Sequence, residues 1–373
     1  MKNFLKKIRN FIRGYTMTNV LNLFLSKNLK KYWKNCNKNN FDDLLTNSMK
    51  KYILSVDYKK TSDHHKLAII KILKLIENSG NKESSSEFQF NNPNFHSDFS
   101  DATISQMIDS SLDNKEPFDD LFKIYPSIKI ENSLKLNLIN NLIYNKIKNK
   151  KIFENIHTLN DDAFVGSGNI YNFQNNLKIT QEKLRTLIEY ETILPLIKKD
   201  NFKIVEIGSG NGRICDCIVN NSKSISKYVL IDIPPALPSA FKRLTKSLKN
   251  KKVFFGIDIT DQNTFDEVMK NNDIILIFPN QIKFLKQKYF DLFIAIDCLH
   301  EMKKNTVKEY MKIAKYTSRN IFFKVHEKAH VPFSFDIYDI NNNDYFIDFS
   351  FNLIFKKRSL FPSNDWECAY KLN

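Results

Sequence analysis

Short apolar runs separated by helical stretches dominate the sequence from about residue 180 onward. Continuous apolar runs are typical of parallel strands that are buried on both faces, and their alternation with helices predicts βαβ units around one sheet. The runs are KIVEIG (203–208), YVLIDI (228–233), KVFFGI (252–257), DIILIF (273–278), DLFIAI (291–296) and NIFFKV (320–325).

Further elements flank these runs. Thr180 can cap a helix that continues through Glu191 and beyond. At the other end, FNLIFKKRSLF (351–361) and WECAYKL (366–372) have no helix between them, so they predict an antiparallel hairpin at the sheet edge. The expected fold is therefore α/β, with a Rossmann-like, mostly parallel sheet and an antiparallel C-terminal hairpin. The apolar face of the first helix is expected to hold Leu184, Leu187, Ile188 and Leu194.

The first half of the chain has a different pattern. Residues 2–15 place apolar side chains at helical spacing with basic residues between them, which is typical of an amphipathic helix on an anionic membrane surface or of a helix packed on the protein. Residues 79–101 lose all periodicity and indicate a polar loop. We therefore expect a basic helical region (1–78), a polar linker (79–101), a helical lead-in (102–179) and the α/β domain (180–373).

Charge is concentrated in the first of these regions. The 373 residues carry a formal charge of +16, and residues 1–60 hold 14 Lys and Arg against 3 Asp and Glu, a net +11. Only 16 − 11 = +5 remains for the other 313 residues. The basic character therefore indicates little about the substrate of the α/β domain, and it weakens a nucleic-acid interpretation.

The cysteines and the apolar runs limit the cellular location. Five scattered cysteines without a CxxC pair argue against a disulfide framework and a structural zinc site, so no metal is expected. No apolar run approaches the ~20 residues needed to span a bilayer. The sequence predicts a cytoplasmic protein, with peripheral binding at the inner membrane face as an option for the basic helix.

The strongest chemical signal is a cluster of glycines at one strand end. Gly208, Gly210 and Gly212 are three of only eight glycines in the chain, and a helical run follows them. Such a turn lets the backbone approach a ligand while the first amides of the helix offer donors. Asp232 ends the next predicted strand, where a carboxylate can accept both hydroxyl hydrogens of a ribose. Arg213 occupies the position at which a dinucleotide-binding fingerprint has its third glycine, so the spacing here is not that of the G-x-G-x-x-G motif.

The spacing E-x-G-x-G-x-G, beginning at Glu206, resembles that of class I S-adenosylmethionine-dependent methyltransferases. The resemblance implies S-adenosylmethionine as cofactor, with Glu206 near its methionine moiety and Asp232, with Ile233 beside it, at its ribose. Three further segments resemble the bacterial family of sugar O-methyltransferases, and this resemblance covers about residues 160–370. They are YVLIDIPPAL (228–237), FPNQ (278–281) and LHEM (299–302).

Two strand ends remain for the adenine ring. Asp258 follows one apolar run, and Asn280 with Gln281 follows another. We favour the Asn280–Gln281 pair, because the run before it is the more convincing buried strand and the family resemblance lies there.

Polar groups after residues 291–296 are expected to face the transferred methyl group, because ligands bind beyond the carboxyl ends of strands. His300 is the expected general base, with Glu301 or Asp297 as its partner. The segment lacks the Asn/Asp-Pro-Pro-aromatic motif of enzymes that methylate exocyclic amino groups of bases, which favours an oxygen acceptor.

A second histidine motif, HEKAH (326–330), matches the H-E-x-x-H zinc-protease pattern. That chemistry requires both histidines on one face of a sustained helix. Here a predicted strand comes directly before the motif and Pro332 follows it, so we expect no zinc site.

Three functions fit these patterns. The favoured one is methyl transfer to a hydroxyl of a sugar, in a surface glycan or its precursor. The alternatives are an RNA methyltransferase anchored by the basic segment, and a non-catalytic binding protein that keeps the fold.

Overall fold

The computed structural model describes residues 144, 171–172, 178–179, 181–233, 236–330, 336–360 and 365–373. The expected basic helix at 2–15, the polar linker and almost all of the helical lead-in lie outside these residues, so their boundaries stay predictions. No helix within the described ranges is long and apolar enough to cross a membrane.

The expected alternation of strands and helices is present. The α/β part runs through β3 (Phe202–Ile207), α9 (Arg213–Asn221), β4 (Ile225–Ile231), α10 (Ala236–Ser247), β5 (Val253–Phe255), α11 (Gln262–Asn271), β6 (Ile274–Ile277), β7 (Phe290–Ile296), α12 (Lys304–Thr317) and β8 (Ser318–His326). Short 3-10 helices η6 (Gly256–Asp258), η7 (Pro279–Phe284) and η8 (Leu299–Glu301) follow β5, β6 and β7. The run at 252–257 forms a strand of only three residues, because its end turns into η6.

These strands form one sheet in the order β11-β12-β8-β7-β3-β4-β6-β5. The strands from β8 to β5 pair in parallel. The last two strands, β11 (Phe351–Arg358) and β12 (Asp365–Leu372), form an antiparallel hairpin, and β12 pairs antiparallel with β8. The Rossmann-like sheet with its C-terminal hairpin is thus confirmed. Four shorter strands pair outside this sheet: β1 (Tyr171–Asn172) with β2 (Lys178–Ile179), and β9 (Lys328–His330) with β10 (Ile337–Asp339).

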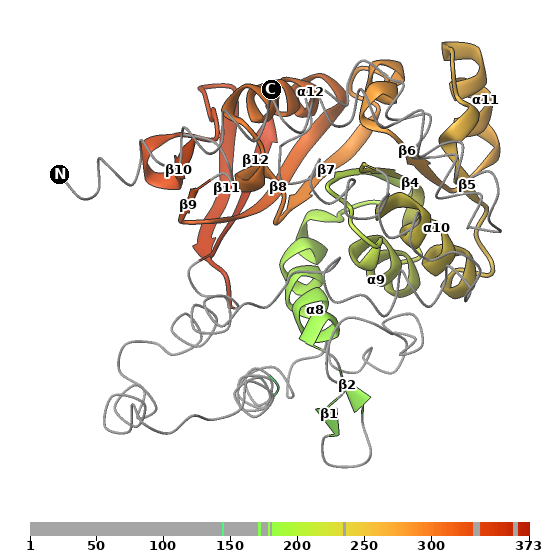
Figure 1. Cartoon of the computed structure of the whole chain (residues 1–373), viewed down its shortest axis with the longest axis horizontal. Coiled ribbons are helices and arrows are strands. Elements are labelled where there is room, and N and C mark those ends of the chain that lie inside the picture. The colour runs from blue at the N-terminus through green and yellow to red at the C-terminus, as the bar shows by residue number, and fades with distance from the viewer. Residues whose placement is uncertain are drawn as a thin grey trace, which may run out of the picture.

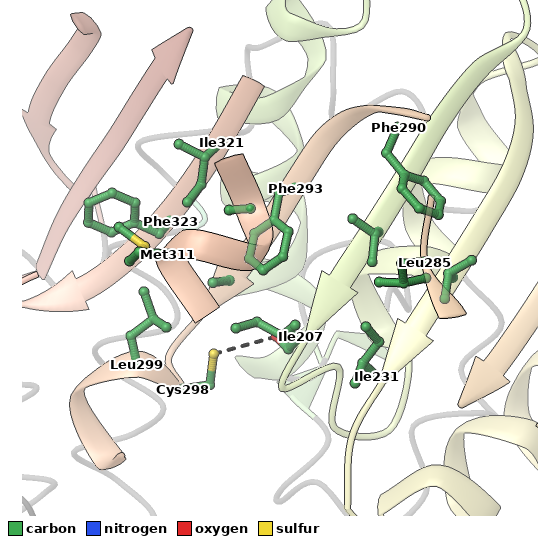
Figure 2. Close-up of a cluster of buried hydrophobic side chains, with 14 of the residues drawn as sticks. Ile207, Ile231, Leu285, Phe290, Phe293, Cys298, Leu299, Met311, Ile321 and Phe323 are labelled. Atoms are coloured by element: carbon green, nitrogen blue, oxygen red, sulfur yellow. Dashed lines mark hydrogen bonds between the residues drawn. The ribbon is translucent and has the colours of Figure 1, made fainter. Parts of the chain in front are cut away.

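Helices cover both faces of the sheet (Figure 1). The helix α8 (Gln181–Ile193) lies with α9 and α10 on one side, and α12 lies on the other. Every residue of β6 and β7 is buried, as the continuous apolar runs predict. Figure 2 shows the core between these layers, in which the Cys298 thiol donates to the Ile207 carbonyl oxygen at 3.4 Å.

The helix predicted to follow Thr180 is present as α8, with one difference on its apolar face. Leu184, Leu187 and Ile188 are buried as expected. Leu194 is 43% exposed, because α8 ends at Ile193 and a 3-10 turn containing Pro195 points Leu194 away from the core, while Leu196 of the same turn is buried. The expected cap, Thr180, lies outside the described residues.

Candidate functional site

The glycine turn lies between β3 and α9, at the carboxyl edge of the sheet. Gly208, Gly210 and Gly212 have φ angles of 62°, 55° and 76°, a left-handed conformation that glycine adopts at little cost. A Cβ atom on Gly208 would lie 2.3 Å from the Cβ of Cys298, so the close packing of two strand ends also requires glycine there. A Cβ on Gly210 would meet nothing within 4 Å. Space beside the backbone is therefore open at Gly210.

Asp232 follows β4 and bonds directly to this turn. The Gly210 amide donates to Oδ2 of Asp232 at 2.6 Å, and the Ile233 amide donates to Oδ1 at 2.7 Å. Burial raises the pKa of Asp232 to about 6, although both amides favour the carboxylate. The structure therefore brings together the glycines, Asp232 and Ile233, which the sequence placed at one cofactor site.

Glu206 lies within β3, before the glycine turn. Its carboxylate is buried and accepts a 2.7 Å hydrogen bond from the Tyr228 hydroxyl. Burial raises the pKa of Glu206 to about 8, which makes this carboxyl group protonated at neutral pH. A cationic ligand group nearby would instead favour the ionised carboxylate of Glu206.

Asn280 and Gln281 lie in η7, after β6, but only one of them has polar atoms left for a ligand. Gln281 is buried, accepts from the Phe278 amide at 2.8 Å and donates to the Gly256 and Ile259 carbonyl oxygens at 2.6 and 2.9 Å. The side chain of Gln281 therefore holds the loops together. The Oδ1 atom of Asn280 is buried without a hydrogen-bond partner. The rival candidate, Asp258, is exposed after the edge strand β5.

A buried cluster of charges joins α8 to the ends of β7 and β8. Glu189 of α8 pairs with Arg213 and, at 2.9 Å, with Lys324, whose side chain is fully buried. Arg185 pairs with Asp297, which has a φ of 55°. Burial disfavours an ionised Asp297, but the charges of Lys324, Arg185 and Arg213 outweigh it and hold the pKa of Asp297 below its usual range. Asp297 is thus a permanent carboxylate and a weak base.

His300 occupies a different environment from the one expected. It lies in η8, is 5% exposed, and its Nδ1 accepts from the His326 amide at 3.4 Å. Burial, aided by the neighbouring His326, lowers the pKa of His300 to about 3. Desolvation therefore keeps the imidazole of His300 neutral at neutral pH.

Glu301, the next residue, has the opposite shift. Burial and the charge of Asp297 raise the pKa of Glu301 to about 7. Of the three expected catalytic side chains, Glu301 alone titrates near neutral pH.

His326 and Asp365 form a pair that the sequence did not predict. Nδ1 of His326, at the end of β8, is hydrogen-bonded to Oδ1 of the buried Asp365, at the start of β12. The H-E-x-x-H pattern that begins at His326 spans the strands β8 and β9 and forms no helix. Within the described ranges, no group of three or more His, Cys, Asp or Glu side chains could hold a metal ion. The sequence feature that could have indicated the role of His326 is its position at the carboxyl end of a buried strand.

Among the comparisons with known proteins, only the comparison with solved structures found proteins similar to this chain. No protein-family profile and no curated protein matches the chain. A SAM-dependent methyltransferase from Aquifex aeolicus matches with 11% identity and a TM-score of 0.35, over 52% of this chain and 94% of that chain. A S-adenosylmethionine-dependent methyltransferase from Clostridium acetobutylicum matches with 10% identity and a TM-score of 0.34, over 52% and 93% of the two chains.

A third likeness is to phosphoethanolamine N-methyltransferase 1 from Haemonchus contortus, solved with phosphoethanolamine and S-adenosylhomocysteine. It has 11% identity and a TM-score of 0.35, and the match covers 49% of this chain and 41% of that chain.

Proposed function

We propose that this protein binds S-adenosylmethionine and transfers its methyl group to a hydroxyl of a sugar. The observation that carries the proposal is the hydrogen bond between the Gly210 amide and Asp232, which joins a left-handed glycine turn to a carboxylate at the next strand end. In open α/β sheets, ligands bind outside the carboxyl ends of the strands, and this pair lies at that edge.

The residues present fit a nucleoside-containing cofactor. The open space at Gly210 lets a ligand approach the backbone, and Asp232 can accept ribose hydroxyl hydrogens with the remaining lone pairs of its oxygens. The unpartnered, buried Oδ1 of Asn280 is an acceptor suited to the amino group of an adenine. When bound, the cofactor supplies a methyl group on a positively charged sulfur.

Glu206 is assigned to the methionine moiety by family resemblance. Its protonated carboxyl group lies in β3 directly before the turn. An ammonium group nearby favours the ionised carboxylate, so ligand binding would release a proton from Glu206.

A hydroxyl acceptor is supported by the groups on the neighbouring strand ends. A hydroxyl is a weak nucleophile until a base removes its proton, and titratable side chains lie at the carboxyl ends of both β7 and β8. The choice of a sugar rests on the resemblance of the segments at 228–237, 278–281 and 299–302 to sugar O-methyltransferases. The expected substrate is a glycan or a glycan precursor.

Isothermal titration calorimetry of the full chain tests the cofactor. We expect wild-type protein to bind S-adenosylmethionine, and Asp232→Ala to weaken binding at least tenfold, which is about 1.4 kcal/mol. Asp200→Ala is the matched control, because Asp200 is exposed and precedes β3, at the opposite end of that strand from the glycine turn, and it should keep wild-type affinity. Equal affinity in wild type and Asp232→Ala, or tighter binding of NAD, would contradict the proposal.

A further inference from the structure

The His326–Asp365 pair has the geometry of an oriented base. The two residues lie opposite each other in the antiparallel pairing of β8 with β12, and Asp365 is fully buried. Because the carboxylate accepts from Nδ1, the lone pair of a neutral ring lies on Nε2. The His326 side chain is 40% exposed, and Nε2 bonds to none of the described residues. This nitrogen can therefore receive a proton from a ligand.

The pair lies beside the proposed cofactor site. His326 ends β8, which pairs with β7, and β7 in turn pairs with β3, the strand that ends in the glycine turn. Glu301 follows β7, His326 ends β8 and Asp232 follows β4, so the three groups lie at the carboxyl edge of one sheet. The charges of both His326 and Asp232 act on the pKa of Glu301. A ligand placed beyond these strand ends would contact both His326 and the cofactor.

His300 supports the orientation of His326. The two rings are stacked with centroids 4.0 Å apart and planes at 27°. The hydrogen bond from the His326 amide to Nδ1 of His300 requires that nitrogen to be unprotonated. Two charged rings at this distance would repel each other, and the greater burial of His300 leaves the proton to His326.

We propose that His326, oriented by Asp365, is the general base of the methyl transfer, and that His300 is a positioning residue. This inference rests on the proposed function. Nε2 of His326 takes the hydroxyl proton while the hydroxyl oxygen bonds to the methyl carbon. The carbon–sulfur bond breaks, its electron pair stays on sulfur as a neutral thioether, and the imidazolium later releases its proton to water.

The charged groups around His326 set the pH at which it acts. Asp365, Asp297 and Glu301 are its acidic neighbours, and Lys324 and His300 are its basic ones. Burial lowers the pKa of His326, but the hydrogen bond and charge of Asp365 outweigh it, so the net shift is upward. Transfer should therefore increase with pH through the ionisation of His326.

The experiment uses the full chain, radiolabelled S-adenosylmethionine and a panel of methyl glycosides as sugar-hydroxyl probes. His326→Asn keeps an amide that can donate to Asp365 but lacks Nε2. We expect it to keep cofactor affinity within twofold and to lose about 10²- to 10⁴-fold in transfer rate. Glu327→Gln is the control, because Glu327 is adjacent but pairs with Arg358, and it should keep the wild-type rate.

A second measurement does not depend on that variant. Histidine NMR should give His326 a pKa equal to the midpoint of the wild-type rate profile, and Asp365→Asn should move both to lower pH. Near-wild-type transfer by His326→Asn, a larger loss in Glu301→Gln than in His326→Asn, or an NMR pKa that differs from the kinetic midpoint would each overturn the assignment. A wild type that binds no S-adenosylmethionine would instead contradict the proposed function itself.

Discussion

Gly208 and Gly210 share a left-handed backbone but differ in what surrounds them, so alanine at each should separate packing from binding. Gly208→Ala combines backbone strain with a clash against Cys298, and we expect the free energy of unfolding to decrease by about 2–4 kcal/mol. Gly210→Ala has the strain alone, about 1–2 kcal/mol, but its methyl group enters the open space beside Asp232. Urea denaturation and calorimetry should show the larger stability loss at Gly208, and a loss of cofactor affinity in a folded Gly210→Ala protein. The reverse order of stabilities would contradict this account.

The buried carboxyl group of Glu206 should make stability fall as pH rises. Its pKa is about 8 in the folded protein against a usual value near 4.5, so the folded state binds the extra proton between these values. Stability is therefore greatest below the lower value and is lost through the upper one. Glu206→Gln keeps an acceptor for Tyr228 but cannot ionise, so between pH 5 and 8 it should lose less stability than wild type, by on the order of a few kcal/mol. If the free energy of unfolding, measured with urea, depends equally on pH in both proteins, Glu206 does not titrate between pH 5 and 8.

At the scale of elements, buried charges join α8 to the sheet. Glu189 of α8 and Lys324 of β8 have no exposed side-chain surface, so removing either one takes the closest opposite charge from a buried partner. Arg213 beside Glu189 and Asp365 at 3.6 Å from Lys324 compensate the remaining charge only in part. We expect Glu189→Met or Lys324→Met to lower the free energy of unfolding by about 3–5 kcal/mol, and the double variant to lose less than the sum. Glu309→Gln breaks the exposed Glu309–Lys312 pair on α12 and should cost under about 1 kcal/mol. Additive losses in the double variant would show that Glu189 and Lys324 are energetically independent.

At the scale of the whole molecule, the charge distribution predicts a surface interaction separate from the chemistry. Residues 1–60 carry a net +11 of the total +16, and every candidate cofactor residue lies beyond residue 200. We expect the full chain to sediment with anionic vesicles and not with neutral ones. Added salt should release the protein from the anionic vesicles. Exchanging Lys2, Lys6, Lys7 and Arg9 for Gln should weaken sedimentation and leave S-adenosylmethionine affinity unchanged. Loss of cofactor binding in that variant would instead connect the segment to the site.

Local patterns in the sequence are sufficient to predict the α/β architecture and the position of the glycine turn. Both depend on local rules: continuous apolar runs are buried on both faces of a parallel sheet, and glycines at close spacing indicate a turn with unusual backbone angles. The antiparallel hairpin could also be predicted, because a short connection without a helix cannot return a strand in parallel. That the glycine turn lies beside Asp232 and Ile233 could be predicted as well, because neighbouring parallel strands end at the same edge of the sheet. Their role in cofactor binding stays a prediction.

Contacts between residues that are far apart in the chain set the charge and the exposure of each polar side chain. Arg185 and Asp297 are 112 residues apart in the chain, and His326 and Asp365 are 39 apart, yet these contacts fix which groups are charged. Periodicity and spacing report neighbours along the chain, whereas burial and distant charges set a pKa. The sequence alone therefore does not distinguish His300 from His326, whereas the folded arrangement makes His300 a buried, neutral imidazole and leaves the imidazole of His326 partly exposed.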